Sequence, residues 1–146
     1  MKEKGSSKVQ SAKMKSDDIF CKIISGDIPS YKIYEDEHFF AFLDISPLKL
    51  GHTLLVPKEH FEYLFEMPDE LYTALWLKAK GLAPAIQQAA NSQRVGVVVE
   101  GFAVPHVHIH LVPIDMANEL DSHNQKPAEK EDLEEMRTKI VSRIVL

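Results

Sequence analysis

The spacing of apolar and polar residues along the chain alternates between helical and strand periods. Three segments have helical spacing: a short one that Asp17 or Asp18 can cap and Gly26 can end, a long one from about Pro68 to Ala90, and a charged one from about Glu129 to the C-terminus. Strand spacing is found in Tyr31–Glu35, Phe39–Leu43, Thr53–Pro57, Val95–Val99 and a histidine-bearing run that ends at Pro113. Short sequential connections between these elements favour antiparallel pairing and an α+β domain.

The run "VPHVHIHLVP" holds three of the seven histidines of the chain, each separated from the next by one apolar residue. This alternation has the period of a β-strand, so His106, His108 and His110 are expected on one face while the apolar residues between them face the core. Pro105 and Pro113 bracket the run, as suits strand ends. Histidine titrates near neutral pH, so a row of three indicates proton transfer, nucleophilic attack or metal ligation rather than a solvated face.

Composition and charge limit the classes of function. The 146 residues, 45% hydrophobic and 27% charged, indicate one globular domain over residues 17–146, preceded by a basic tail, residues 1–16, that we predict to be disordered. The net charge of −5 argues against a dedicated binder of nucleic acid or of anionic membranes, and no apolar run approaches the length of a membrane span. The single cysteine, Cys21, excludes an internal disulfide and fits a reducing compartment, so a cytoplasmic location is expected.

The histidine run resembles the histidine-triad (HIT) motif, in which three histidines alternate with apolar residues. The stretch "DIFCKIISGDIPSYKIYEDEHFFAFLDISPLKLGHTLLVPKEH" is similar to the N-terminal half of that family nearly position for position, so the resemblance covers roughly residues 18–113. It implies an α+β HIT-like fold with about five antiparallel strands, a short N-terminal helix, a long central helix and a C-terminal helix. It also implies a homodimer that acts on a nucleotide.

The resemblance assigns roles to residues of this chain. His108, the middle histidine, matches the nucleophile, with His106 and His110 as flanking partners and His52 as support from the neighbouring strand. Asp44 matches the acid that binds the ribose hydroxyls, which suits a carboxylate because it can accept a charge-assisted hydrogen bond from each of two vicinal hydroxyls. The apolar and backbone lining of the nucleoside pocket is expected from Ile45, Ile19, Phe20, Ile23, Phe42 and Leu43. As plainer alternatives, Asp44 is a turn-forming residue and the isoleucines and phenylalanines are core.

Three departures from the family pattern change these expectations. Many members carry Cys-x-x-Cys as half of a structural zinc site, whereas this chain has Asp18 and Cys21, so we expect that zinc site to be absent and read Lys58 and His60 as a solvated strand end. Before the triad, Gly101 retains the glycine of a phosphate-binding loop, but Phe102 and Ala103 replace its polar pair. The third histidine is kept as His110, which disfavours the uridylyltransferase branch, where glutamine stands.

These features predict a nucleotide-binding hydrolase or nucleotidyl transferase that cleaves at a nucleoside α-phosphate through a covalent nucleotidyl-histidine. A purine nucleotide is expected as substrate, either a phosphoramidate or a dinucleoside polyphosphate, with no cofactor beyond Mg²⁺ brought by a polyphosphate. Two alternatives stay open. One is a catalytically weak nucleotide-binding or scaffold protein of the same fold, and the other is a metal site made by the triad histidines and completed by His52.

Overall fold

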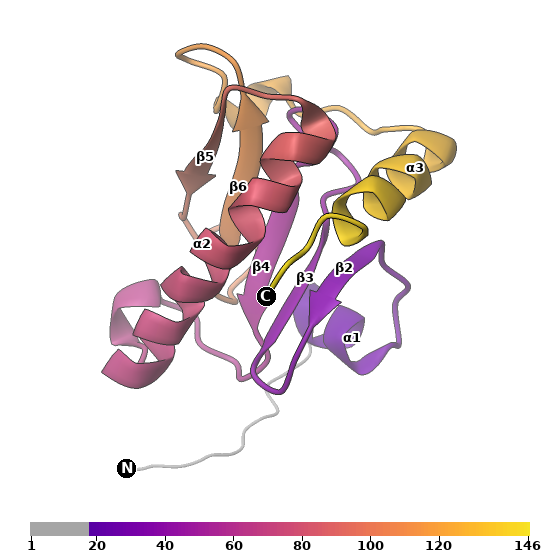
Figure 1. The fold of residues 1–146 in the computed structure, drawn as a ribbon. Helices are drawn as coiled ribbons and strands as arrows, with labels where there is room; N and C mark the ends of the chain where they lie inside the picture. The colour runs from indigo at the N-terminus through magenta and orange to yellow at the C-terminus, as the bar shows by residue number, and fades with distance from the viewer. Residues whose placement is uncertain (1–17) are drawn as a thin grey trace.

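Within residues 18–146, which the computed structural model describes, five antiparallel strands form one sheet in the order β2-β3-β4-β6-β5 (Figure 1). The strands are β2 (Lys32–Glu35), β3 (Phe39–Leu43), β4 (Thr53–Pro57), β5 (Arg94–Val98) and β6 (Ile109–Ile114). The helices are α1 (Ile19–Ser25), α2 (Asp69–Ala90) and α3 (Lys130–Val141), with 3-10 turns η1 (Leu64–Glu66) and η2 (Ser122–Asn124). The predicted α+β class is confirmed, whereas the predicted disordered tail lies outside the described residues.

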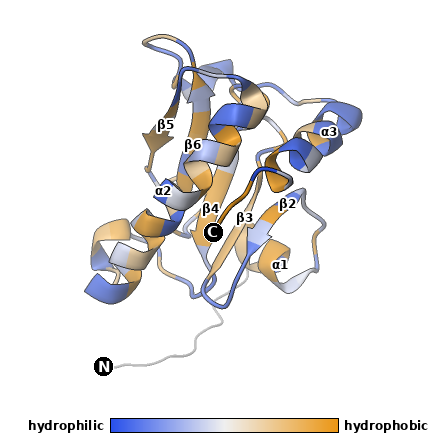
Figure 2. Ribbon diagram, in the orientation of Figure 1, coloured by the Kyte–Doolittle hydropathy of each residue, from blue (hydrophilic) through white to orange (hydrophobic). Residues whose placement is uncertain are grey.

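The adjacent interior strands β3 and β4 are buried on both faces, so their successive side chains enter two different cores. Ala41, Leu43 and Leu55 join the larger core, which α2 and α3 cover. The alternate residues join a smaller core with Phe20 and Ile23 of α1, and they are Phe40, Phe42, Leu54 and Val56. Figure 2 shows these strands as mostly apolar, whereas polar residues are frequent along α2 and α3. The alternation therefore gives the sheet a second apolar face, and α1 packs against that face.

The ends of the predicted helices follow from their capping residues. The carboxylate of Asp18 accepts a hydrogen bond from the backbone N–H of Cys21 at 2.8 Å and so begins α1. Gly26 ends the helix with φ of 91°, a left-handed conformation that glycine adopts without strain. The long helix α2 continues unbroken through Pro84 and ends at Asn91, which also has a positive φ of 53°.

The strand that carries the histidines is shorter than the alternation predicts. It begins at Ile109, so His106 and His108 precede it rather than lie in it. The reason is that the backbone here bonds elsewhere: the N–H of Val107 donates to the Phe61 carbonyl at 2.7 Å instead of to β4. The carbonyl of Pro57, at the end of β4, faces the ring of His106 at 2.8 Å. Side-chain and loop contacts thus replace the ladder beyond the Leu55–Ile109 pair.

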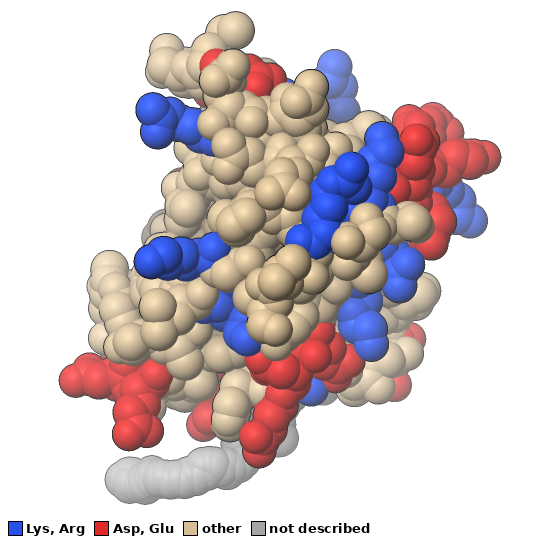
Figure 3. All heavy atoms as spheres, viewed as in Figure 1, with Lys and Arg blue, Asp and Glu red and all other residues tan. Residues whose placement is uncertain are grey.

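Charged residues of both signs are mixed over the helix-covered face of the molecule. Figure 3 shows acidic side chains gathered over α3 and near the start of α2, where Glu131, Asp132, Asp69 and Glu70 lie in the first turns. Negative charge at these ends complements the helix dipoles. Of the helices described, none combines the length and the apolar composition that crossing a bilayer requires.

Candidate active site

A cleft of about 810 Å³ opens on the α1 side of the sheet. It lies between α1, the loop after β3, the loop before β6 and the segment that contains η2. The structure places in its lining all but one of the residues singled out from the sequence, namely His52, His108, His110, Asp44, Ile45, Phe42, Leu43, Ile19, Phe20, Ile23 and Gly101. His106 is the exception, because its side chain is fully buried outside the lining.

A backbone hydrogen bond fixes the protons of two cleft histidines. The N–H of Leu48 donates to Nδ1 of His52 at 3.0 Å, so that nitrogen is unprotonated. The proton of neutral His52 is therefore on Nε2, which lies 2.9 Å from Nδ1 of His110. His110 Nδ1 must then accept, and the proton of neutral His110 lies on Nε2. The relay makes His110 a hydrogen-bond donor into the cleft.

His108 has the opposite tautomer. Its Nδ1 lies 2.6 Å from the backbone carbonyl oxygen of His106, which can only accept, so Nδ1 carries the proton. Nε2 of neutral His108 then keeps its lone pair. The ring is held further by Phe20, whose centroid is 4.9 Å away in an edge-on contact. A nitrogen with a lone pair and a fixed orientation is what a nucleophile requires.

Burial keeps the histidines of the cleft neutral. It lowers the pKa of His52 to about 4 and, together with the neighbouring His108 and His52, that of His110 to about 4. It also lowers the pKa of His108, although the His106 carbonyl and the charge of Asp44 oppose the shift. The histidines are thus uncharged near pH 7, and an anion that enters the cleft would raise their pKa values.

Asp44 is the acidic side chain closest to this relay. Its Oδ2 lies 3.7 Å from His52 Nε2, and its Oδ1 accepts from the N–H of Ser46 at 2.9 Å. The side chain is 16% exposed, and burial raises the pKa of this carboxyl although the hydrogen bonds from Ser46 and Gln125 act against the shift. Asp44 therefore offers the cleft an acceptor pair beside a wall of apolar side chains.

The loop before the triad presents apolar atoms where the family pattern has polar ones. Phe102 is 93% exposed and lines the rim of the cleft with Ala103. Gly101 has φ of 85°, so a side chain would be strained there, which explains why a glycine stands at this place in the loop. Backbone groups rather than side chains are available for hydrogen bonds at Phe102 and Ala103.

No feature of the residue pattern predicts that residues 120–125 reach the cleft. Leu120, Asp121, Ser122, His123 and Gln125 all line it, although the sequence indicated only a polar loop here. Composition carries no signal for such docking, because it depends on tertiary contacts such as the 3.0 Å bond from the N–H of Ala128 to the carbonyl of Ile45.

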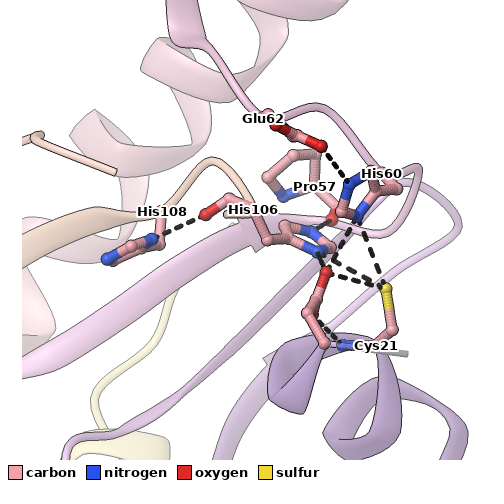
Figure 4. Close-up of polar contacts among 7 residues, drawn as sticks. Cys21, Pro57, His60, Glu62, His106 and His108 are labelled. Atoms are coloured by element: carbon pink, nitrogen blue, oxygen red, sulfur yellow. Dashed lines mark hydrogen bonds and ion pairs between the residues drawn. The ribbon is translucent and has the colours of Figure 1, made fainter. Parts of the chain in front are cut away.

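A second cluster of chemically reactive groups lies beside the buried ring of His106. Asp18 and His60 are in contact, with Oδ2 and Nδ1 at 2.8 Å, and both approach Cys21 Sγ, at 3.4 Å and 3.8 Å (Figure 4). His106 Nδ1 completes the group, 3.2 Å from Asp18 Oδ2 and 3.5 Å from the sulfur. His60 is 16% exposed, so the expectation of a solvated strand end is wrong for this residue. Its side chain turns inward because α1 brings Asp18 to it.

These four groups fit a metal ion. Their donor atoms all lie within 4.8 Å of one another, and the donor set of one sulfur, two imidazoles and one carboxylate suits zinc. In a tetrahedral zinc site with bonds of about 2.0–2.3 Å, ligand atoms lie roughly 3.3–3.8 Å apart, close to the separations in this cluster. The Pro57 carbonyl would accept from His106 Nε2–H and so fix Nδ1 as the ligand atom.

The triad itself fits a metal less well. Asp44, His52 and His110 also lie within 4.8 Å of one another. However, the Leu48 N–H holds His52 in the tautomer whose Nε2 is protonated, and this N–H donates to the lone pair of His110 Nδ1, so neither nitrogen is available to a metal. His106 faces the other cluster, so the three triad histidines do not converge on one point.

Comparison with known protein families matches residues 25–117 to the HIT domain. The chain is 45% identical over 100 residues to Protein hit of Bacillus subtilis, covering 65% of this chain and 69% of that relative. It is 43% identical over 96 residues to adenosine 5′-monophosphoramidase HNT1 of Saccharomyces cerevisiae, with 65% and 61% of the two chains covered. It is 37% identical over 114 residues to adenylylsulfatase HINT3 of Arabidopsis thaliana, with 75% and 58% covered.

Solved structures agree with these relatives. A Hit-like protein from Bartonella henselae, described as involved in cell-cycle regulation and crystallised with an unknown ligand, superposes with a TM-score of 0.76 at 30% identity, covering 87% of this chain and 96% of that one. A Zn-bound histidine triad family protein from Mycobacterium smegmatis gives a TM-score of 0.72 at 28% identity, with 86% and 94% covered.

Proposed function

The chain belongs to the HIT family, and from that premise we propose that it is a nucleotide hydrolase or nucleotidyl transferase that cleaves at a nucleoside α-phosphate through a covalent nucleotidyl-histidine. The observation that carries the proposal is the pair of opposite tautomers in the cleft. His108 offers a lone pair and His110 offers a proton, two chemically distinct groups on neighbouring rings. Relatives named as a phosphoramidase and an adenylylsulfatase support hydrolysis as the class of reaction.

The nucleoside would bind in the apolar part of the cleft. Phe20, Ile23 and Phe42 present apolar surface to a purine, and Ile45, which is 60% exposed, would lie beside the base. Asp44 would accept from the two ribose hydroxyls. The α-phosphate would then point toward His108 and His110, which line the same cleft.

In the proposed first step, Nε2 of His108 attacks the phosphorus atom and the bond from phosphorus to the leaving group breaks. The nucleotide is then held on His108 as a phosphoramidate, while the leaving group takes up a proton. His110 Nε2–H donates a hydrogen bond to a phosphate oxygen and so stabilises the charge there, while the proton for the leaving group comes from water, because His110 Nδ1 already accepts from His52. Water then attacks the adduct, releases the nucleoside monophosphate and restores neutral His108.

His106 acts on the reaction through its backbone in this account. Its carbonyl oxygen accepts from His108 Nδ1 and would stabilise the positive charge that the ring acquires as its other nitrogen bonds to phosphorus. The fully buried side chain instead holds the loop in place through Pro57 and Asp18. The sequence predicts His106 as a flanking partner of the nucleophile, and we propose that it acts by positioning His108.

A turnover screen tests the function. Purified protein is incubated with adenosine and guanosine phosphoramidates and with dinucleoside polyphosphates, and nucleoside monophosphate is measured by chromatography. His108→Ala protein serves as the blank for contaminating hydrolases. Release of monophosphate by the native chain but not by His108→Ala protein supports the proposal. No release from any of these substrates by folded native protein contradicts it.

As a second proposal, the cluster of Asp18, Cys21, His60 and His106 binds a structural zinc ion. When bound, the ion would supply charge and a crosslink between α1, the loop after β4 and the triad loop. Metal analysis of protein purified without chelators is expected to give about one zinc per chain. Asp18→Asn should lower the metal content and the melting temperature. Native protein that contains no zinc as purified, and whose melting temperature does not change when zinc is added, would contradict the site.

A further inference from the structure

The segment after β6 reaches back to the acidic residue of the cleft. Gln125 lies 81 positions after Asp44, yet its amide nitrogen Nε2 is 3.1 Å from Asp44 Oδ2 and 2.7 Å from the carbonyl oxygen of Ser46. Both partners are acceptors, so they use both hydrogens of the amide. A flipped amide would place its oxygen against two other oxygens, which fixes the orientation of the side chain.

A short turn holds Gln125 in place. In η2, the carboxylate of Asp121 accepts from the N–H of His123 at 3.0 Å, and the N–H of Gln125 donates to the Ser122 carbonyl at 3.1 Å. Three residues after Gln125, the N–H of Ala128 bonds to the carbonyl of Ile45 at 3.0 Å. The segment is thus fastened on both sides of Gln125, and the amide reaches Asp44 from a fixed backbone.

The hydrogen bonds of Asp44 leave room for a diol. An ionised carboxylate has about four acceptor positions, two on each oxygen. The Ser46 N–H occupies one position on Oδ1 and the Gln125 amide one on Oδ2. One acceptor position therefore remains on each oxygen, and two vicinal hydroxyls can each donate to one of them.

We infer that Gln125 is a positioning residue that holds the Asp44 carboxylate in the orientation a vicinal ribose diol requires, so that the preference of this chain for ribonucleotides over 2′-deoxynucleotides depends on Gln125. The inference rests on the proposed function, because it needs Asp44 as the ribose contact. Without the amide, the carboxylate loses the bond that fixes Oδ2. The second hydroxyl should then add less to binding.

The test compares the binding of two nucleotides to three proteins. AMP and 2′-deoxyAMP are titrated calorimetrically into the wild type, Gln125→Met and the control Gln88→Met, whose glutamine is exposed on α2. We expect the wild type and the control to prefer AMP. Gln125→Met should lose roughly three- to tenfold of that preference, less than the full contribution of a charge-assisted hydrogen bond because Asp44 itself remains, and mainly through weaker binding of AMP. A preference in Gln125→Met equal to that of the wild type overturns the inference.

A second measurement needs no nucleotide. The Asp44 carboxyl is titrated by carbon NMR in the wild type and in Gln125→Met, with thermal melting to verify that the variant is folded. Because the hydrogen bond from the Gln125 side chain stabilises the ionised carboxylate, loss of that hydrogen bond should raise the pKa of Asp44. An unchanged pKa overturns the inference. Absence of nucleotide binding by the wild type identifies failure of the proposed function, and the ribose role of Gln125 fails with it.

Discussion

His108 carries its proton on Nδ1 and His110 carries its proton on Nε2, and this difference gives the two residues different expected roles. In the proposed mechanism His110, which accepts a hydrogen bond from His52, would donate to the phosphate, and neither of these two residues would form the bond to phosphorus. We predict that His110→Ala and His52→Ala lower kcat but leave measurable turnover, because a donor is lost while the nucleophile remains. Initial rates with a phosphoramidate substrate test this, and complete loss of turnover in folded His52→Ala would contradict it.

Phe102 is the residue at which this chain departs most visibly from the family pattern. A side-chain donor there would add a hydrogen bond to the phosphate, worth about 0.5–1.5 kcal/mol for a neutral pair and more with a charged acceptor. We predict that Phe102→Gln lowers KM or raises kcat. If the rate is unchanged or lower, the alignment of this loop with the polar pair of the family is wrong. Such an effect would support the alternative of a catalytically weak protein, which rests on the missing polar pair.

Burial of His52 and His110 gives the fold an acid sensitivity. In the folded state the pKa of each is about 4, against about 6.5 for the unfolded chain. Between these values the unfolded state binds more protons, so the free energy of unfolding should fall as pH drops from about 6.5 to 4. Urea unfolding across this range measures the slope. His52→Gln should flatten it, whereas Gln88→Met, a change of an uncharged exposed side chain on α2, should not.

At the scale of elements, the sequence predicts what depends on local pattern and misses what depends on tertiary bonds. The bounds of β3 and β4 follow from their apolar runs, and α1 from its Asp18 cap and its terminal Gly26. The start of β6 does not, since the loss of its first ladder bonds depends on Phe61 and Pro57 far away in the chain. The docking of η2 and the inward orientation of His60 also depend on contacts between distant parts of the chain, so local pattern does not predict them.

For the whole molecule, we predict a homodimer. In the described chain, β5 is an edge strand with Val97 43% exposed, and Leu77 of α2 is 62% exposed. Unpaired edges with apolar residues favour pairing with a second copy. Sedimentation at micromolar concentration should give a dimer, and Val97→Asp should shift it toward monomer, whereas Val141→Asp on α3 should not. A wild-type monomer at this concentration would contradict the prediction.

The central claim for the whole molecule is that catalysis passes through a nucleotide bonded to His108. Protein is quenched in base during turnover of an adenosine phosphoramidate, because an N-phosphoryl histidine is lost in acid, and is then digested and analysed by mass spectrometry. We expect an adenylyl adduct on the peptide that contains His108, with no adduct and no turnover in folded, nucleotide-binding His108→Ala protein. Full activity in His108→Ala, or an adduct located on His106 or His110 instead, would contradict it.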